Sequence, residues 1–322
     1  MVACRAESQY IEGHFPMTIL LILLTTVLLF LLGVSLILFV IGPGMLLHPH
    51  RRTIQYYRRV TSLLHPRDLG LPYEEFLTET NDGYRLSCWF VPAERNAKGT
   101  IVHLHGVSES KIVGLPLAER LHKHGYHVFL YDSRRHGDSE GKFCTYGFYE
   151  KHDTSTLITR LQNRKDLRLG RIGLFGSSMG AAVAIQVAAA DKRIEAVIAE
   201  SGFATLRTIF DDYQRRMIKL PWHYLRNMVI VRSERLAHFK ASSVSPMDSV
   251  KDVHVPIFIM HGTEDPLIRC SYSEQLYANT GDPKELWLIE GADHSNMAEV
   301  GGEDYYRRII EFYDRALGDP AP

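Results

Sequence analysis

The chain has 322 residues, of which 45% are hydrophobic, and its 37 Lys and Arg residues balance 37 Asp and Glu residues. Neutral charge excludes a protein that binds nucleic acid by neutralising many phosphates, and the hydrophobic content excludes a disordered chain. The four cysteines lie far apart without a CxxC pair, at Cys4, Cys88, Cys144 and Cys270. This spacing supports neither a zinc knuckle nor a disulfide framework and indicates free thiols in a reducing compartment.

The first predicted element is a transmembrane helix over residues 17–42, which follows an N-terminal tail of residues 1–16. The stretch MTILLILLTTVLLFLLGVSLILFVIG holds about 26 residues without a charge, enough to cross a hydrocarbon core of about 30 Å. A cleaved signal peptide is the main alternative, but it needs a basic leader and a small-residue cleavage site, and neither is evident here. A buried core helix is a weaker alternative, because such helices rarely run this long without a polar face.

The charges around this stretch predict its orientation and a basic juxtamembrane segment over residues 43–72. Upstream stand Arg5, Glu7 and Glu12, whereas four arginines follow within about 20 residues of the stretch, namely Arg51, Arg52, Arg58 and Arg59. The asymmetry predicts a single-pass membrane protein whose C-terminal part is cytoplasmic, and the arginines could also contact anionic headgroups. Within the segment, RRTIQYYRRVTSLLH is expected to form a helix that Pro66 ends.

From residue 73 to 320 the pattern predicts one α/β domain with a mostly parallel sheet. Residues 75–80 and 84–91 are β-type runs joined by Asn81-Asp82-Gly83, a hairpin signal. Short apolar strands then alternate with helical segments, at 100–104, 126–131, 171–175, 194–199, 256–260 and 286–289. Apolar strands alternating with helices indicate a parallel sheet covered on both faces. Residues 203–244 lack a clear strand and are predicted to form a helical lid over the carboxyl edge of the sheet.

The loop after residues 171–175 contains the candidate nucleophile. It is Gly176-Ser177-Ser178-Met179-Gly180, a GxSxG pattern between an apolar strand and a small-residue helix. A sharp strand-to-helix turn exposes the hydroxyl of the central serine, and the flanking glycines give the turn room. The pattern therefore predicts Ser178 as a nucleophile, against the alternative of a glycine-rich packing turn.

A serine hydroxyl needs a base, and the base needs a third group to orient it. Asp265 follows residues 256–260 in HGTEDPLI, and His294 follows residues 286–289 in EGADHSNM. The order Ser, acid, His is the one expected for an α/β-hydrolase. We expect His294 to be the base and Asp265 the orienting acid, with Glu264 and Asp293 as rival acids.

The loop after residues 100–104, HLHGVSES, is predicted to complete an oxyanion hole. The two donors would be the backbone N–H groups of Val107 and of Met179, which follows the nucleophile. The histidines of this loop are expected to brace it. A metal site is the weak alternative, because no carboxylate or cysteine accompanies these histidines at a recognisable spacing; its ligands would be His103, His105, His122, His124 and His127.

These motifs together resemble the serine-hydrolase branch of the α/β-hydrolase superfamily over roughly residues 76–317. The resemblance rests on HLHG, GYHVFLYDSRRHGDSEG, GLFGSSMG, VPIFIMHGTEDPLI and GADHSN, and is closest to single-domain hydrolases of esterase, lipase or prolyl-oligopeptidase type. It implies a triad of Ser178, Asp265 and His294, and no metal or organic cofactor. One departure is Arg135, which stands where such enzymes carry a small residue in D-x-R-G-H-G-x-S and puts the local loop conformation in question.

The resemblance leaves the substrate open. A membrane-tethered carboxylesterase, lysophospholipase or thioesterase is expected, with a lipid or small-molecule ester as substrate, the bilayer as partner, and no nucleic acid or required protein partner. The lid mixes aromatic and basic residues that could admit an acyl chain and an anionic headgroup, or could simply be solvated; they are Arg207, Arg215, Arg216, Lys219, Trp222, Tyr224 and Arg226. A peptidase or amidase of the same fold, and a non-catalytic binding protein, remain alternatives.

Overall fold

An eight-stranded sheet forms the centre of the structure. The structure is a computed structural model that describes residues 17–217 and 223–318, and it describes side chains in these ranges outside residues 215–225. Its strands are β1 (Glu74–Glu79), β2 (Arg85–Val91), β3 (Gly99–Leu104), β4 (Tyr126–Tyr131), β5 (Arg171–Ser177), β6 (Ile194–Glu200), β7 (Ile257–Gly262) and β8 (Lys284–Ile289). The order is β1-β2-β4-β3-β5-β6-β7-β8, in which β2 is antiparallel to β1 and β4 and the other neighbours are parallel. The predicted fold class is confirmed, and the mostly parallel sheet follows from the apolar strands.

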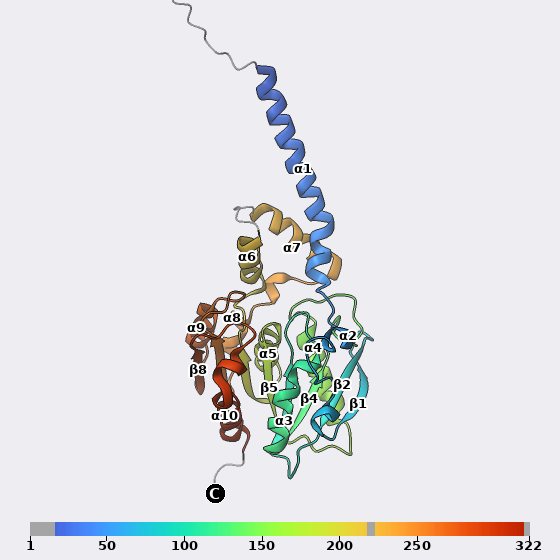
Figure 1. The fold of residues 1–322 in the computed structure, drawn as a ribbon, viewed down its shortest axis with the longest axis vertical. Coiled ribbons are helices and arrows are strands. Elements are labelled where there is room, and N and C mark those ends of the chain that lie inside the picture. Colours follow the sequence, from blue (N-terminus) through green and yellow to red (C-terminus); the bar gives the residue numbers. More distant parts are fainter. Residues whose placement is uncertain (1–16, 218–222, 319–322) are drawn as a thin grey trace, which may run out of the picture.

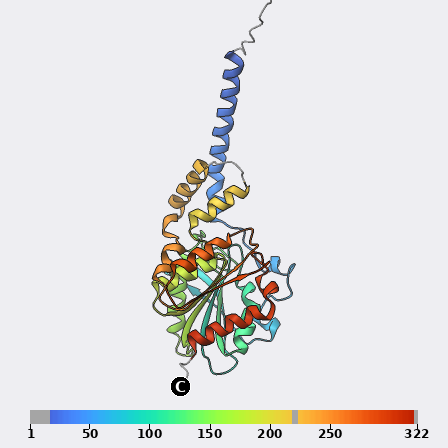
Figure 2. The same ribbon diagram turned by 90° about the vertical axis from the view of Figure 1, so that its left-hand side faces the viewer.

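Helices cover both faces of the sheet (Figures 1 and 2). The α-helices are α1 (Met17–Leu47), α2 (Ile54–Tyr57), α3 (Leu115–Lys123), α4 (Glu150–Gln162), α5 (Met179–Ala190), α6 (Leu206–Met217), α7 (His223–Ala237), α8 (Pro246–Ser249), α9 (Cys270–Asn279) and α10 (Met297–Leu317). Short 3-10 helices are η1 (Pro66–Leu69), η2 (Lys111–Gly114), η3 (Ala241–Ser243) and η4 (Val250–Asp252). Successive side chains of a strand point to opposite faces of the sheet, so each strand contributes residues to two separate hydrophobic cores.

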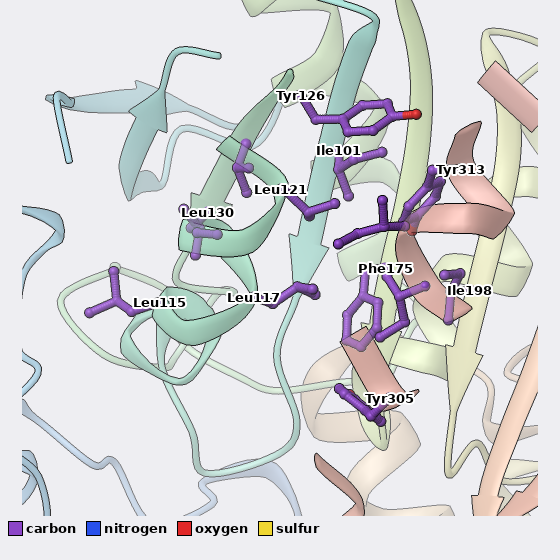
Figure 3. Packing of buried hydrophobic residues seen from close by; sticks show 14 of the residues in the cluster. Ile101, Leu115, Leu117, Leu121, Tyr126, Leu130, Phe175, Ile198, Tyr305 and Tyr313 are labelled. Atoms are coloured by element: carbon purple, nitrogen blue, oxygen red, sulfur yellow. The ribbon is translucent and has the colours of Figure 1, made fainter. Parts of the chain in front are cut away.

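The first core lies between the sheet and helices α3 and α10. Figure 3 shows Leu121 of α3 and Tyr313 of α10 among its members, with Ile101 and Phe175 from the strands. The second core lies on the opposite face, where α4, α5 and α9 pack on residues such as Val102, the strand neighbour of Ile101. Because both faces are buried, the site for chemistry is left to the carboxyl ends of the strands.

A third apolar cluster lies beyond that edge and includes the lid segment, residues 203–244, whose helices are α6 and α7. Leu47, the last residue of α1, is buried in this cluster together with Met179 of α5. Helix α1, predicted to end at residue 42, thus continues past Pro43, and its last turns pack on α7 (Figure 1). A Cβ on Gly42 would lie 2.6 Å from Cγ2 of Val229, so the two helices approach closely there.

The remainder of α1 is a solvent-facing apolar helix. Among the described residues it is the helix long and apolar enough to cross a membrane, and most of its length projects away from the sheet (Figures 1 and 2). At 1.5 Å per residue its 31 residues extend about 46 Å. The charged tail before it, with Arg5, Glu7, Glu12 and Cys4, lies outside the described residues.

The prediction of a helix over residues 51–65 is wrong. The structure has one helical turn, α2, and Pro66 begins η1 instead of ending a helix. The side chain of Tyr57 is buried in the core beside α3, and Arg51 donates a hydrogen bond to the carbonyl of Gly137 at 2.6 Å. These long-range contacts hold the segment across the domain and outweigh its local helix propensity.

Candidate active site

The sharp turn between β5 and α5 places Ser178 at the carboxyl edge of the sheet. Ser178 has φ 56° and ψ −115°, a strained conformation for a residue with a side chain, and only 8% of its surface is exposed. Its N–H donates to the carbonyl of Glu200 at 2.8 Å, which ties the turn to β6. A Cβ on Gly180 would lie 2.0 Å from the carbonyl oxygen of Leu104, so glycine is needed for the close approach of helix and strand.

His294 and Asp265 lie next to Ser178 in a continuous hydrogen-bonded row. His294 Nε2 is 3.1 Å from Ser178 Oγ, and its Nδ1 is 2.6 Å from Asp265 Oδ2. Asp265 also accepts hydrogen bonds from the N–H groups of Leu267 and Ile268, at 2.7 and 2.9 Å. The three residues that the sequence singled out from three different loops are thus brought together with the spacing that proton transfer requires.

Sequence reasoning missed His261, which also contacts this row. His261 Nε2 lies 3.2 Å from Asp265 Oδ2, and its Nδ1 faces Ser273 Oγ at 2.7 Å. Burial alone would raise the pKa of Asp265, but hydrogen bonds from His261 and His294 outweigh burial and hold that pKa well below its ordinary value. Asp265 is therefore a carboxylate at neutral pH. The sequence does place a histidine, His261, near the end of β7 and four residues before Asp265, and this position could have indicated a contact with the acid.

The local charges also act on His294. Burial lowers the pKa of its imidazole, but the hydrogen bond to Asp265 and the negative charges of Asp265, Glu109 and Glu200 together raise it above its ordinary value. The protonated imidazolium is thus stabilised, as a base that accepts a proton from Ser178 requires.

Neither rival acid forms a hydrogen bond to His294 within the described residues. Asp293 accepts hydrogen bonds from the N–H groups of Ser295 and Asn296, at 2.7 and 3.0 Å, and so caps the turn that precedes α10. Glu264 is exposed, and its N–H donates to the carbonyl of Ala292. Within the described ranges, the ring nitrogens of His294 form hydrogen bonds to Ser178 and Asp265 alone.

Two backbone N–H groups, those of Val107 and Met179, belong to segments next to Ser178. Met179 is the first residue of α5, whose dipole directs partial positive charge toward its N-terminus. A Cβ on Gly106 would lie 3.3 Å from Ser178 Cβ, so the loop that carries Val107 lies against Ser178. Across residues 17–217 and 223–318, the N–H groups of Val107 and Met179 have no protein acceptor. Both are free to donate to an oxyanion.

The two histidines at the end of β3, His103 within the strand and His105 just after it, have separate surroundings. His105 braces the loop, because its Nε2 accepts from the N–H of Ser133 at 2.9 Å and its Nδ1 donates to the carbonyl of Gly106 at 2.8 Å. His103 stacks on Phe175, with ring centroids 5.5 Å apart. In the described part of the chain, no group of three His, Cys, Asp or Glu side chains is arranged to hold a metal.

Arg135 adopts the left-handed conformation that its position requires. Its φ is 69°, which explains why glycine is the usual residue there in the resembling enzymes. The N–H of Arg135 donates to the carbonyl of Glu140 at 2.9 Å, and its Nε lies 3.2 Å from His48 Nδ1. The loop therefore keeps its turn, at the cost of local strain.

The predicted basic lid is only partly described. Arg207 is exposed, and Arg226 forms an ion pair with Asp211. Lys219 and Trp222 lie outside the described residues, as do the side chains of three further predicted lid residues, Arg215, Arg216 and Tyr224.

Comparison with known proteins identifies the family. The family model described as serine aminopeptidase, S33, matches residues 95–246. An uncharacterized protein of Bacillus subtilis, YqkD, is 30% identical over 241 residues, which cover 74% of this chain and 78% of that protein. The alpha/beta hydrolase domain-containing protein 17B of Xenopus tropicalis is 24% identical over 248 residues, 76% of each chain. The Pyrococcus furiosus esterase Pf2001 superposes with a TM-score of 0.69 at 27% identity, covering 84% of this chain and all of the esterase. This chain belongs to the α/β-hydrolase superfamily and is a hydrolase of the esterase or peptidase type.

Proposed function

We propose that the protein is a serine hydrolase that cleaves carboxylic esters or thioesters through an acyl-enzyme. The observation that carries this proposal is the row from Ser178 Oγ to His294 Nε2, at 3.1 Å, and from His294 Nδ1 to Asp265, at 2.6 Å. A hydroxyl, an imidazole and an ionised carboxylate in this order form the arrangement that activates a serine.

In the proposed mechanism, His294 removes the proton of Ser178 while Oγ attacks the carbonyl carbon of the substrate. The N–H groups of Val107 and Met179 stabilise the oxyanion that forms. His294 then gives its proton to the leaving oxygen or sulfur, the bond to the leaving group breaks, and an acyl-Ser178 ester remains. Water, deprotonated by His294, releases the carboxylic acid and restores Ser178.

We further propose that α1 anchors the enzyme in a bilayer, with the hydrolase domain in the cytoplasm. The length and apolar surface of α1 support the anchor, and the arginines that follow it support the orientation. In sealed right-side-out vesicles, whose interior is the cytoplasmic side, the C-terminus should be protected from added protease, and its digestion there would contradict the orientation.

The test is a substrate screen with the full chain in detergent or vesicles. p-Nitrophenyl esters of increasing acyl length, lysophospholipids and acyl-CoA separate an esterase, a lysophospholipase and a thioesterase. We expect turnover of at least one ester class, abolished by Ser178→Ala. A folded protein that hydrolyses none of them would instead favour a binding protein built on this fold.

The family model's description favours a peptidase as the second candidate. Amino-acid p-nitroanilides test it directly, because they place an amide where the proposed substrates carry an ester. Faster turnover of anilides than of p-nitrophenyl esters would replace the esterase proposal by this one.

A further inference from the structure

The lid helix α7 meets α1 where the apolar helix joins the domain (Figures 1 and 2). Val229 packs on the backbone of Gly42, and the guanidinium of Arg232 lies over the ring of Phe39, 4.3 Å from its centroid. Because Phe39 precedes Gly42 by three residues, Arg232 reaches about 4.5 Å farther along α1, away from the domain. The proposed mechanism does not use this arginine.

The charge of Arg232 has no partner among the described residues. Its Nε is buried and forms no hydrogen bond, and within residues 17–217 and 223–318 no carboxylate forms an ion pair with it. Residues 215–225, whose side chains are not described, include neither Asp nor Glu. Glu234, two residues farther along α7, accepts a hydrogen bond from the N–H of Ala241 at 2.9 Å and pairs with Lys240. Buried polar groups are nearly always bonded, so Arg232 indicates that an anion from outside the chain binds there.

The length of α1 gives the depth of Arg232 when the helix spans a bilayer. A hydrocarbon core of about 30 Å takes about 20 helical residues, and the exposed apolar surface of α1 runs from Met17 to Ile41. A core that begins at Met17 therefore ends near Leu36, and a core that ends with the exposed surface ends at Ile41. Phe39 lies within about 4.5 Å of either limit, and the headgroup layer on each side is about 5–7 Å thick. Both placements put Arg232 next to the headgroups.

Other exposed side chains of α7 are of the kinds found at bilayer surfaces. Arg235, about one turn after Arg232, is exposed and forms no ion pair within the described part of the chain. Val231 and Leu236 are large apolar side chains that are 43% and 44% exposed. Exposed apolar side chains next to arginines are typical of helices that lie in the headgroup layer.

These features select an anion that lies at the bilayer surface. A planar guanidinium with free N–H donors binds a phosphate through two parallel hydrogen bonds, and each phospholipid brings a phosphate to this depth. We propose that a phosphate site, formed by Arg232 and Arg235, binds the phosphate of a lipid headgroup and so docks the lid helix on the bilayer. The inference rests on the proposed membrane anchor and is independent of the serine-hydrolase chemistry.

The phosphate site would attach the domain to the membrane at a second point. At the end of α1, the carbonyl of Leu47 accepts from the N–H of Cys144 at 2.9 Å, and the carbonyl of Leu46 accepts from the hydroxyl of Tyr146 at 2.9 Å. Leu47 also belongs to the same apolar cluster as Met179 of the active site. Since α1 is fastened to the domain in this way, a phosphate bound on α7 holds the carboxyl edge of the sheet toward the bilayer.

A matched pair of ether lipids tests the phosphate site, because an ether lipid offers no ester to hydrolyse. Dihexadecyl phosphatidic acid differs from dihexadecylglycerol by its phosphate alone. Native mass spectrometry of the full chain in detergent micelles measures the affinity for each lipid. We expect the affinity for the phosphate lipid to be roughly 10-fold or more higher. Arg232→Gln should lower this preference by roughly 10-fold, and Arg235→Gln by roughly threefold, because Arg235 is exposed.

Arg95→Gln is the matched control for the loss of one positive charge. Arg95 is exposed in the loop before β3, at the opposite edge of the sheet, so its replacement should leave the preference within about twofold. Inorganic phosphate at the concentration of the lipid should not displace it, and displacement would assign the site to free phosphate instead. Equal affinity for the two lipids, or a preference unchanged in Arg232→Gln, overturns the inference.

Extraction of membranes with alkaline carbonate separates this inference from the proposed anchor. If the full chain stays in the membrane fraction and binds the two lipids equally, the anchor stands and the phosphate site fails. If carbonate releases the full chain, the anchor itself has failed, and the inference that rests on it fails as well.

Discussion

The turn at Ser178 and the lid segment are held in place in different ways. At the turn, a Cβ on Gly176 or Gly180 would meet a backbone carbonyl oxygen at 2.2 or 2.0 Å, and backbone atoms cannot easily move aside. At the lid, α7 meets α1 through its own side chains: Val229 packs on the backbone of Gly42, and Arg232 lies over the ring of Phe39 at 4.3 Å. We therefore expect the fixed backbone geometry of the turn to determine the chemistry, and the side-chain contacts of the lid to be exchangeable without altering it.

The largest effect is expected at the turn itself. Ser178→Ala removes the nucleophile and should lower kcat/KM for a p-nitrophenyl ester by about 10⁴-fold or more. Ser295→Ala is the matched control, because Ser295 is an exposed hydroxyl in the loop of His294 and contacts only Asp293 among the described residues. A comparable loss of kcat/KM in both variants would contradict the role of Ser178 as the nucleophile.

The orienting acid comes next. Asp265→Asn should lower kcat by roughly 10³- to 10⁴-fold, because the amide no longer stabilises the imidazolium of His294. Asp293→Asn should cost at most a few-fold, since an asparagine can still cap the turn. Steady-state kinetics of the two variants decide between the acids, and the reverse order would assign the role to Asp293.

The pH profile sharpens the account of the charges around the turn. The neutral form of His294 is the base, and its pKa is raised above 6.5, so kcat/KM should fall as pH drops through a value above 6.5. Glu109→Gln removes one of the negative charges that raise this pKa, so the fall should move to lower pH. A shift to higher pH, measured between pH 5 and 9, would contradict this electrostatic assignment.

A smaller effect is expected where α1 meets the lid. Gly42→Leu must displace Val229 and should destabilise this contact by about 1–3 kcal/mol, whereas Gly33→Leu enters open space on the same helix. Limited trypsin digestion should cut α7 faster in Gly42→Leu alone, with kcat/KM for a short ester within about twofold of wild type. Loss of that activity would show that the lid contact also controls the chemistry.

The smallest effect is expected at the strained loop. Arg135→Gly relieves a left-handed conformation at φ 69° and should raise the free energy of unfolding by about 0.5–1 kcal/mol. Urea denaturation measures the change. A decrease would mean that the contact of Arg135 with His48 outweighs the strain.

The sequence predicted the parts of the molecule that depend on local patterns. Each of the eight strands coincides with an apolar or alternating run of the sequence. Ser178, Asp265 and His294 lie in the segments after three of these strands, so the shared edge of a parallel sheet brings them together. The GxSxG glycines likewise indicate the turn before any contact is known.

The remaining features depend on contacts between distant segments. Burial of Tyr57 beside α3 replaces a predicted helix by a single turn, and no local pattern announces it. Glu109 and Glu200 come from separate segments and act together on His294 only once the sheet is assembled. The packing of α1 on α7 joins residues far apart in the chain. The uncharged apolar sequence of α1 predicts a helix but does not specify which other helix it contacts.

The most direct test of the central claim is the site of reaction with a fluorophosphonate. We expect the full chain in vesicles to gain one phosphonyl adduct on Ser178, located by mass spectrometry of its peptide, and to lose it in Ser178→Ala. Labelling should be slowed in His294→Ala, because the hydroxyl is then not activated. Folded wild-type protein that stays unlabelled, or an adduct at another serine, would contradict the proposal that Ser178 is the nucleophile.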